Sequence, residues 1–174
     1  SLKYILNFTN HSLMCTRRLL RDAHQSIVRR DTFGSTIHKL SFDGRQTFFG
    51  YYDKTPFSLD NSKILGLVAP LGNKSPRPED ELVVGYFDRA NNDTFHQIGV
   101  TSTWCWQQSC RLQWLPENEN ELIIYNTMVN GGYGSVVQNV NTKEIIRKYK
   151  APIYDVDKSG SWAITLNFSR LHRL

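Results

Sequence analysis

The sequence has little cysteine and no long apolar run, and both absences narrow what the protein can be. Three cysteines, an odd number, do not indicate a disulfide framework. Cys105 and Cys110 are too far apart for a CxxC motif, and no histidine lies near them to complete a zinc site. Because no apolar run approaches the roughly 20 residues of a membrane-spanning helix, we expect no membrane span. We also expect no metal and no cofactor.

Outside one arginine-rich stretch, the chain has little excess of positive charge. The net charge is +5, and five arginines between Arg17 and Arg30 supply much of it. The rest of the chain is nearly balanced, so the composition does not indicate a nucleic-acid partner. The first residues are too polar for a signal peptide, and N-x-S/T sequons are too short to establish secretion. A cytoplasmic location is therefore favoured, while a signal peptide removed before Ser1 stays open.

One helix is predicted, near the N-terminus. Over residues 12–30, Leu13, Leu20 and Ile27 fall near one helical stripe and the arginines take the other face. Such a helix either binds an anionic surface or packs on the domain, and we favour packing because solvated cationic faces are common. Residues 1–32 are therefore assigned to a helical segment with an N-terminal α-helix, and residues 33–174 to a β-rich domain.

From residue 33 onward, short β-branched and aromatic runs alternate with polar turns, which predicts an all-β fold. Three segments share one pattern of strand, polar turn and apolar strand: KTPFSLDNSKILGLV, RLQWLPENENELIIYN and IYDVDKSGSWAITLN. Aligning Phe57, Trp114 and Val156 spaces them about 57 and 42 residues apart, and β-propeller blades recur at roughly 40–45 residues. In the second unit, RLQWL, ELIIYNTM, GSVVQNVN and EIIRKYK are expected to be four strands in order from the inner edge, with a tight turn at residues 141–143.

The turns in SLDNSKILGL and DKSGSWAITL resemble the SPDG-like blade signature of TolB-type propellers, and oligogalacturonate lyases use similar blades. Leu59 and Lys158 stand where proline is usual, so the likeness is to a style of blade. Residues 47–172, from FFGYYDKTPF through TWCWQQSCRLQWLP to LNFSRLH, are more similar to bacterial propeller-like proteins without an assigned reaction. The resemblance implies a propeller and leaves its reaction open.

The number of blades is too small for a closed ring. About three are visible, whereas closed propellers typically have four to eight. The chain is therefore expected to be a piece of a larger propeller, to assemble with copies of itself, or to form a smaller open sheet. We favour a piece of a larger propeller, because an exposed blade edge is an aggregation hazard unless it is paired.

Ligands of propellers bind where the inner strands and their loops converge, and three polar clusters are predicted there. They are Tyr51, Tyr52, Asp53 and Lys54; Trp104, Trp106, Gln107 and Gln108; and Asn167, Arg170 and His172. The catalytic candidates are Asp53 and His172. The ligand-binding candidates are Tyr52, Lys54, Trp106, Gln107, Gln108, Asn167 and Arg170.

These clusters also have plainer interpretations. Asp53 and Lys54 can form a solvent ion pair in a turn, and His172 alone is more often structural. Trp104 and Trp106, which their i, i+2 spacing places on one face of a strand, can simply pack between blades. The two following glutamines are expected inside that strand, where burial requires hydrogen-bonding partners from the scaffold or from a hydroxyl-rich ligand.

Taken together, flat aromatic rings, amides, a carboxylate and cations are typical of a carbohydrate site. The sequence therefore favours a carbohydrate-binding or carbohydrate-active propeller, linked to bacterial surface polysaccharide, with a saccharide as its ligand. The alternative is a non-enzymatic propeller that serves as a scaffold for protein–protein interaction, and fold alone does not separate the two. Asp53 and Asp155 are the only obvious inner-strand carboxylate pair for a glycosidase, so enzymatic activity stays open.

Overall fold

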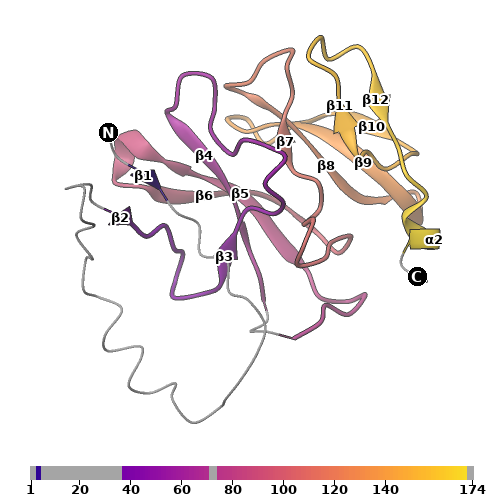
Figure 1. The fold of residues 1–174 in the computed structure, drawn as a ribbon, viewed down its shortest axis with the longest axis horizontal. Helices are drawn as coiled ribbons and strands as arrows, with labels where there is room; N and C mark the ends of the chain where they lie inside the picture. Colours follow the sequence, from indigo (N-terminus) through magenta and orange to yellow (C-terminus); the bar gives the residue numbers. More distant parts are fainter. Residues whose placement is uncertain (1–2, 5–36, 71–73, 172–174) are drawn as a thin grey trace.

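The computed structural model describes residues 3–4, 37–70 and 74–171, and in these residues the protein is all-β, as predicted. Most strands belong to two four-stranded antiparallel sheets and one two-stranded hairpin (Figure 1). A short parallel pair joins β1 (Lys3–Tyr4) to β2 (Ile37–His38). The helical elements described are the 3-10 turn η1 (Arg89–Asn91) and α2 (Phe168–Leu171).

The first sheet is a four-stranded meander. Its strands, in chain order and in spatial order, are β3 (Thr47–Phe48), β4 (Lys63–Val68), β5 (Leu82–Asp88) and β6 (Thr94–Thr101). The segment KILGLV forms β4, and all of its residues after Lys63 are buried. A nearly continuous apolar run of this length is typical of a strand that is covered on both faces.

The second sheet repeats this arrangement. Its strands are β7 (Gln113–Trp114), β8 (Leu122–Val129), β9 (Gly132–Asn139) and β10 (Ile145–Tyr149), again in chain order. Asn130 (φ 51°) and Gly131 (φ 80°) connect β8 to β9, and a two-residue hairpin turn of this type requires left-handed backbone at both positions. The four predicted strands of the second unit and their order are confirmed.

A third unit begins in the C-terminal hairpin, which consists of β11 (Asp155–Val156) and β12 (Ala163–Ile164). The three aligned positions occupy the same place in each unit. Phe57 lies opposite Ile64, Trp114 opposite Ile123, and Val156 opposite Ala163. In the first unit this pairing is an isolated bridge, because the edge of β4 that faces away from β5 is shared between Phe57 and β3.

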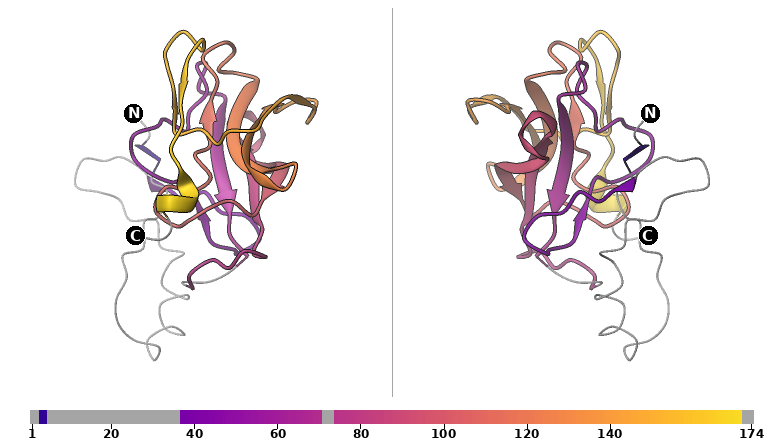
Figure 2. Two further views of the ribbon diagram at one scale, coloured as in Figure 1. Left: turned by 90° about the vertical axis from the view of Figure 1, so that its right-hand side faces the viewer. Right: turned by 90° about the vertical axis from the view of Figure 1, so that its left-hand side faces the viewer.

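The two four-stranded sheets pack against each other through apolar side chains. The largest cluster of buried apolar residues lies between the two sheets and includes Leu65, Leu67, Ile123 and Tyr125. Figure 2 shows the strands of the two sheets lying next to each other from both sides. Gly99 of β6 permits this close approach, because a Cβ atom there would lie 2.6 Å from the Tyr125 hydroxyl oxygen. Such a distance is too short for any other residue without a shift of the tyrosine.

The hairpin packs against the opposite face of the second sheet. Val156 contacts a smaller buried cluster formed by Leu115, Ile124, Val137 and Ile153. Two sheets and a hairpin are thus stacked in sequence order, each covering the face of the one before. No closed ring or barrel is formed by the residues that the structure describes, and the number of blades remains a prediction.

The prediction of an N-terminal helix concerns residues that are not described. The predicted helix at residues 12–30, and with it most of the assigned segment 1–32, lies outside the described residues. In the ranges 37–70 and 74–171, no helix is long and apolar enough to cross a membrane.

Candidate functional site

Five polar side chains meet close to the three equivalent cross-strand positions, Phe57, Trp114 and Val156. Asp53 and Lys54 precede Phe57, Arg111 precedes Trp114, and Tyr154 and Asp155 precede Val156. We call these five residues the inner-edge cluster. Their contacts join segments that lie 43 to 101 residues apart in the sequence.

Arg111 is the centre of the inner-edge cluster. Its Nη2 donates to Oδ2 of Asp53 at 2.8 Å, and its Nη1 to Oδ1 of the same carboxylate at 3.4 Å. Its Nε donates to the Tyr154 carbonyl oxygen at 2.8 Å, and its guanidinium lies 4.0 Å from the centroid of the Tyr154 ring. A planar guanidinium suits this combination of a two-point ion pair and a ring contact.

The backbone that presents Arg111 is unusual. Ser109 and Arg111 have φ values of 54° and 56°, in the left-handed region where non-glycine residues cost about 1 kcal/mol. The Asn126 amide donates to the Cys110 carbonyl oxygen at 2.8 Å and ties this segment to the second sheet. The conformation directs a side chain that is 2% exposed into contact with two other units.

Lys54 connects the two carboxylates of the cluster. Its ammonium contacts Oδ1 of Asp155 directly and lies 4.0 Å from Oδ2 of Asp53. The Val156 amide also donates to the Asp155 carboxylate, at 2.7 Å. Two cations, Lys54 and Arg111, therefore face two carboxylates, and the formal charge of the cluster is zero.

Two tyrosines extend this cluster toward solvent. The ring centroids of Tyr51 and Tyr52 lie 4.2 Å apart, and Tyr52 is 81% exposed. The hydrogen bond between their hydroxyl groups raises the pKa of Tyr51 above its usual value, and the negative charge of Asp53 acts more weakly in the same direction. The pair presents an open aromatic surface beside the fixed charges.

The residues around Trp106 do not form a strand, and this part of the prediction is wrong. Cys105 and Ser109 are bridged around a tight turn that contains Trp106, Gln107 and Gln108. The left-handed backbone at Ser109 ends any extended conformation here. Gln107 is exposed and Gln108 half-buried, so neither is a buried strand residue.

Trp104 and Trp106 have structural partners. Their rings contact each other edge to face at 5.1 Å between centroids, and both contact Phe48 of β3. The Trp104 Nε1 donates to the Asp80 carbonyl oxygen at 2.7 Å, and the Trp106 Nε1 to that of Lys74 at 2.5 Å. The tryptophans thus fasten the segment at 74–80 to the first sheet, so the contacts of both rings are with the protein's own scaffold.

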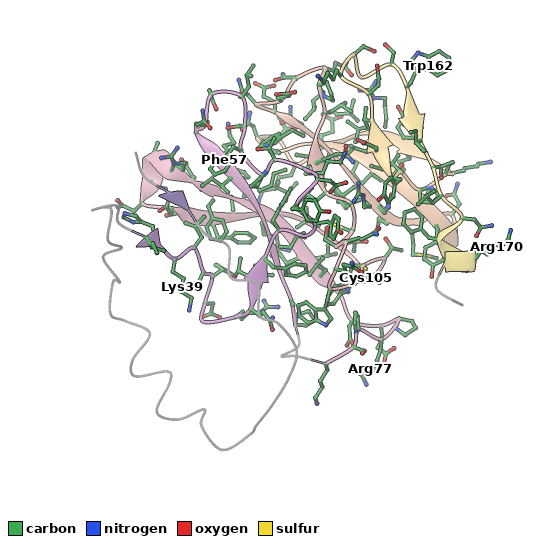
Figure 3. All side chains as sticks on the ribbon, viewed as in Figure 1. Lys39, Phe57, Arg77, Cys105, Trp162 and Arg170 are labelled. Carbon is green, nitrogen blue, oxygen red and sulfur yellow. The ribbon has the colours of Figure 1, made fainter. Side chains whose placement is uncertain are left out.

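The third predicted group lies elsewhere. Asn167 accepts a hydrogen bond from the Arg170 amide at 3.0 Å and caps the short helix α2. Arg170 belongs to α2, and Figure 3 shows it at the margin of the molecule, well separated from Cys105. His172 lies outside the described residues. The structure therefore brings Tyr52, Asp53 and Lys54 together, and records no contact between them and Asn167 or Arg170.

Arg111 and Tyr154 are the cluster members that sequence reasoning missed. The sequence predicts Arg111 as the first residue of the strand RLQWL and Tyr154 as part of the strand that contains Val156, and it marks neither as a site residue. The signal in the sequence is a single arginine that stands between the apolar residues Cys110 and Leu112. The structure shows that both of these neighbours are buried. A buried arginine requires a carboxylate partner, and Asp53 supplies it.

Comparison with known proteins adds no relative: no family model, no curated protein and no solved structure matches this chain. Among residues 3–4, 37–70 and 74–171, no three His, Cys, Asp or Glu side chains gather as a metal site would require.

Proposed function

We propose that the two sheets and the hairpin are blades of a β-propeller, and that the inner-edge cluster with Tyr51 and Tyr52 binds a saccharide. The propeller is supported by the repeated four-strand order and by the three equivalent cross-strand pairs. The observation that carries the ligand proposal is the convergence of charged and aromatic side chains from the starts of three successive inner strands. In a propeller, that position is the mouth of the central channel.

The chemistry of the surface favours a sugar. A saccharide offers flat C–H faces and many hydroxyl groups, so it needs aromatic rings beside donors and acceptors that are already fixed. Tyr52 supplies an exposed ring, while Asp155 and Lys54 supply an acceptor and a donor. Because the charges of the cluster balance, neutral sugar hydroxyls fit it better than a uronic acid, whose carboxylate would have to compete for cations already paired.

Binding is supported better than catalysis. The Asp53 carboxylate accepts hydrogen bonds on both oxygens from Arg111, so both of its oxygens are already engaged within the protein. The second carboxylate, Asp155, is held by Lys54 and by a backbone amide. A glycosidase needs two carboxyl groups that are free to act on the glycosidic bond, and both carboxylates here are engaged in contacts within the protein. We therefore propose a saccharide-binding module.

The test is a glycan-binding screen that includes neutral and acidic bacterial surface polysaccharides, the class to which the resemblance directs attention. Tyr52→Ala should weaken binding of the best neutral glycan by about tenfold or more, the size of one lost stacking contact. Tyr133→Ala is the matched control, because Tyr133 is also exposed but lies in β9. Absence of any glycan binding, or equal losses in the two variants, would contradict the proposal.

A further inference from the structure

A groove of about 190 Å³ lies between the two four-stranded sheets, beside their outermost strands β6 and β10. Val100 of β6 lines one wall, and residues of β8, β9 and β10 line the other, among them Tyr125, Val136, Ile145 and Lys148. We call this cavity the inter-sheet groove. Because both walls are complete sheets, the groove is a feature of the contact between them. Small-molecule sites usually measure roughly 300–1,000 Å³, so the groove suits individual side chains better than a whole small molecule.

Hydrogen bonds fix the floor of the inter-sheet groove. The Tyr125 hydroxyl donates to Oε1 of Gln138 at 2.8 Å. Nε2 of Gln138 in turn donates to the carbonyl oxygens of Ile98 at 3.3 Å and of Lys143 at 2.8 Å. These contacts join β6 to β8, to β9 and to the turn before β10. The groove is therefore formed before any partner binds, which lowers the entropic cost of binding.

Two side chains of β10 face the inter-sheet groove. Lys148 pairs across the strands with Val136, which belongs to the apolar cluster between the sheets. Ile145 pairs with Gln138, whose side chain reaches β6. Partners in a cross-strand pair share a face of the sheet. The groove thus offers an exposed aliphatic side chain and a cation on one strand, and Lys148 is the one charged residue that lines it among the described residues.

The charge around the inter-sheet groove is positive. Residues 143–150 hold four cations and one carboxylate, Glu144. One of the cations, Arg147, is paired with Glu117 on the opposite face of the sheet. In the part of the chain that the structure describes, no ion pair involves the three lysines of this stretch. Lysines on an outermost strand commonly deter pairing with other chains, but Lys148 lines the groove and is available to a carboxylate there.

We propose that the inter-sheet groove binds an extended, acidic peptide segment of a partner protein, with aliphatic side chains against Val100 and Ile145 and a carboxylate on Lys148. An outermost strand presents unpaired backbone groups on its free side, and β6 has no described strand partner beyond β5. An extended chain matches those groups, and the positive charge selects an acidic one. The inner-edge cluster lies at the other end of each sheet, so the proposal does not depend on saccharide binding.

The probe is a phage library of random peptides about nine residues long, which extend to about 30 Å. The library is selected against the immobilised full chain. We expect the enriched peptides to combine aspartate or glutamate with aliphatic residues at alternate positions and to lack lysine and arginine. A synthetic peptide with the consensus sequence is then titrated against the protein by fluorescence polarisation. Selection that enriches no sequence, or that enriches neutral or basic sequences, would overturn the proposal.

Two matched pairs of variants locate the contact. Lys148→Glu should weaken binding of the consensus peptide by about tenfold or more. Lys158→Glu changes the net charge equally at an exposed position between β11 and β12 and should weaken it by less than about threefold. Ile145→Thr should weaken binding by about threefold or more through lost apolar contact, whereas Ile146→Thr should have almost no effect, because Ile146 does not line the groove.

All four positions are exposed, and threonine keeps a β-branched side chain in the strand, so the variants should fold. Their urea unfolding curves check this point. Equal losses of peptide affinity within either pair would contradict the assigned contact. Dimerisation of the chain that Lys148→Glu abolishes would identify a second copy as the occupant and would also overturn the proposal.

Discussion

Replacing Asp53 by alanine should destabilise the protein through the charge that is left behind on Arg111. The guanidinium is 2% exposed, and Asp53 accepts two of its hydrogen bonds. Leaving a fully buried charge without its partner costs about 3–5 kcal/mol. The Nε bond to the Tyr154 carbonyl oxygen remains, and water can reach the site because Asp53 is 29% exposed. We therefore expect a loss of about 2–3 kcal/mol in the free energy of unfolding.

A double-mutant cycle separates this effect from simple loss of contacts. Arg111→Met removes the charge itself and leaves a carboxylate that is exposed to water and near Lys54, so it should cost about 1–2 kcal/mol. The double variant contains no unpaired buried charge. It should be only about 2 kcal/mol less stable than the wild type, which gives a coupling energy of about 2 kcal/mol.

Equilibrium unfolding in urea measures all four proteins, and a constant m-value is needed for the comparison. Glu144→Ala is the control, because it removes an exposed carboxylate and should change stability by less than about 0.5 kcal/mol. If the effects of the two single variants add to within about 0.5 kcal/mol, the ion pair is not coupled and the reasoning is refuted.

Three further predictions follow from individual environments. The Ser62 amide, and then the Ser58 and Ser62 hydroxyls, lower the pKa of Asp60 to about 2. Its contribution to stability is therefore complete above pH about 4 and lost as the pH falls toward 2, so Asp60→Asn should flatten the fall of Tm over this range. Burial raises the pKa of the Cys110 thiol to about 12, so iodoacetamide at pH 8 should alkylate the exposed Cys105 and spare Cys110 in peptide mass spectra. Gly99→Ala should cost about 1–3 kcal/mol in urea unfolding, because its Cβ displaces Tyr125.

The strand order of the second sheet could be predicted because its turns have specific chemistry. Asn130 and Gly131 favour the left-handed backbone of a two-residue hairpin, and apolar runs of strand length flank them. The alignment of Phe57, Trp114 and Val156 was also predictable, because each stands at the same offset before a polar turn. Strand β3 was harder to locate, since two residues carry too little pattern to define an element.

Only part of the candidate site could be read from the sequence. Tyr52, Asp53 and Lys54 are consecutive in the sequence, so their proximity to one another can be read from it directly. The partnership of Arg111 with Asp53 spans 58 residues and depends on a left-handed backbone at a non-glycine residue. Such a conformation has no reliable sequence signature. The same bend makes a turn of the residues around Trp106, where the i, i+2 spacing of the tryptophans predicts a strand.

The most direct test of the account is a backbone amide NMR titration with the neutral glycan that binds best. The account predicts shift changes confined to the starts of the three inner strands, at residues 51–55, 110–112 and 154–156. It also predicts that Tyr52→Ala reduces these shifts in proportion to its loss of affinity. Changes centred on β10 or on the turn around Trp106, or no changes with any glycan, would contradict the claim that the three inner strands form one saccharide site.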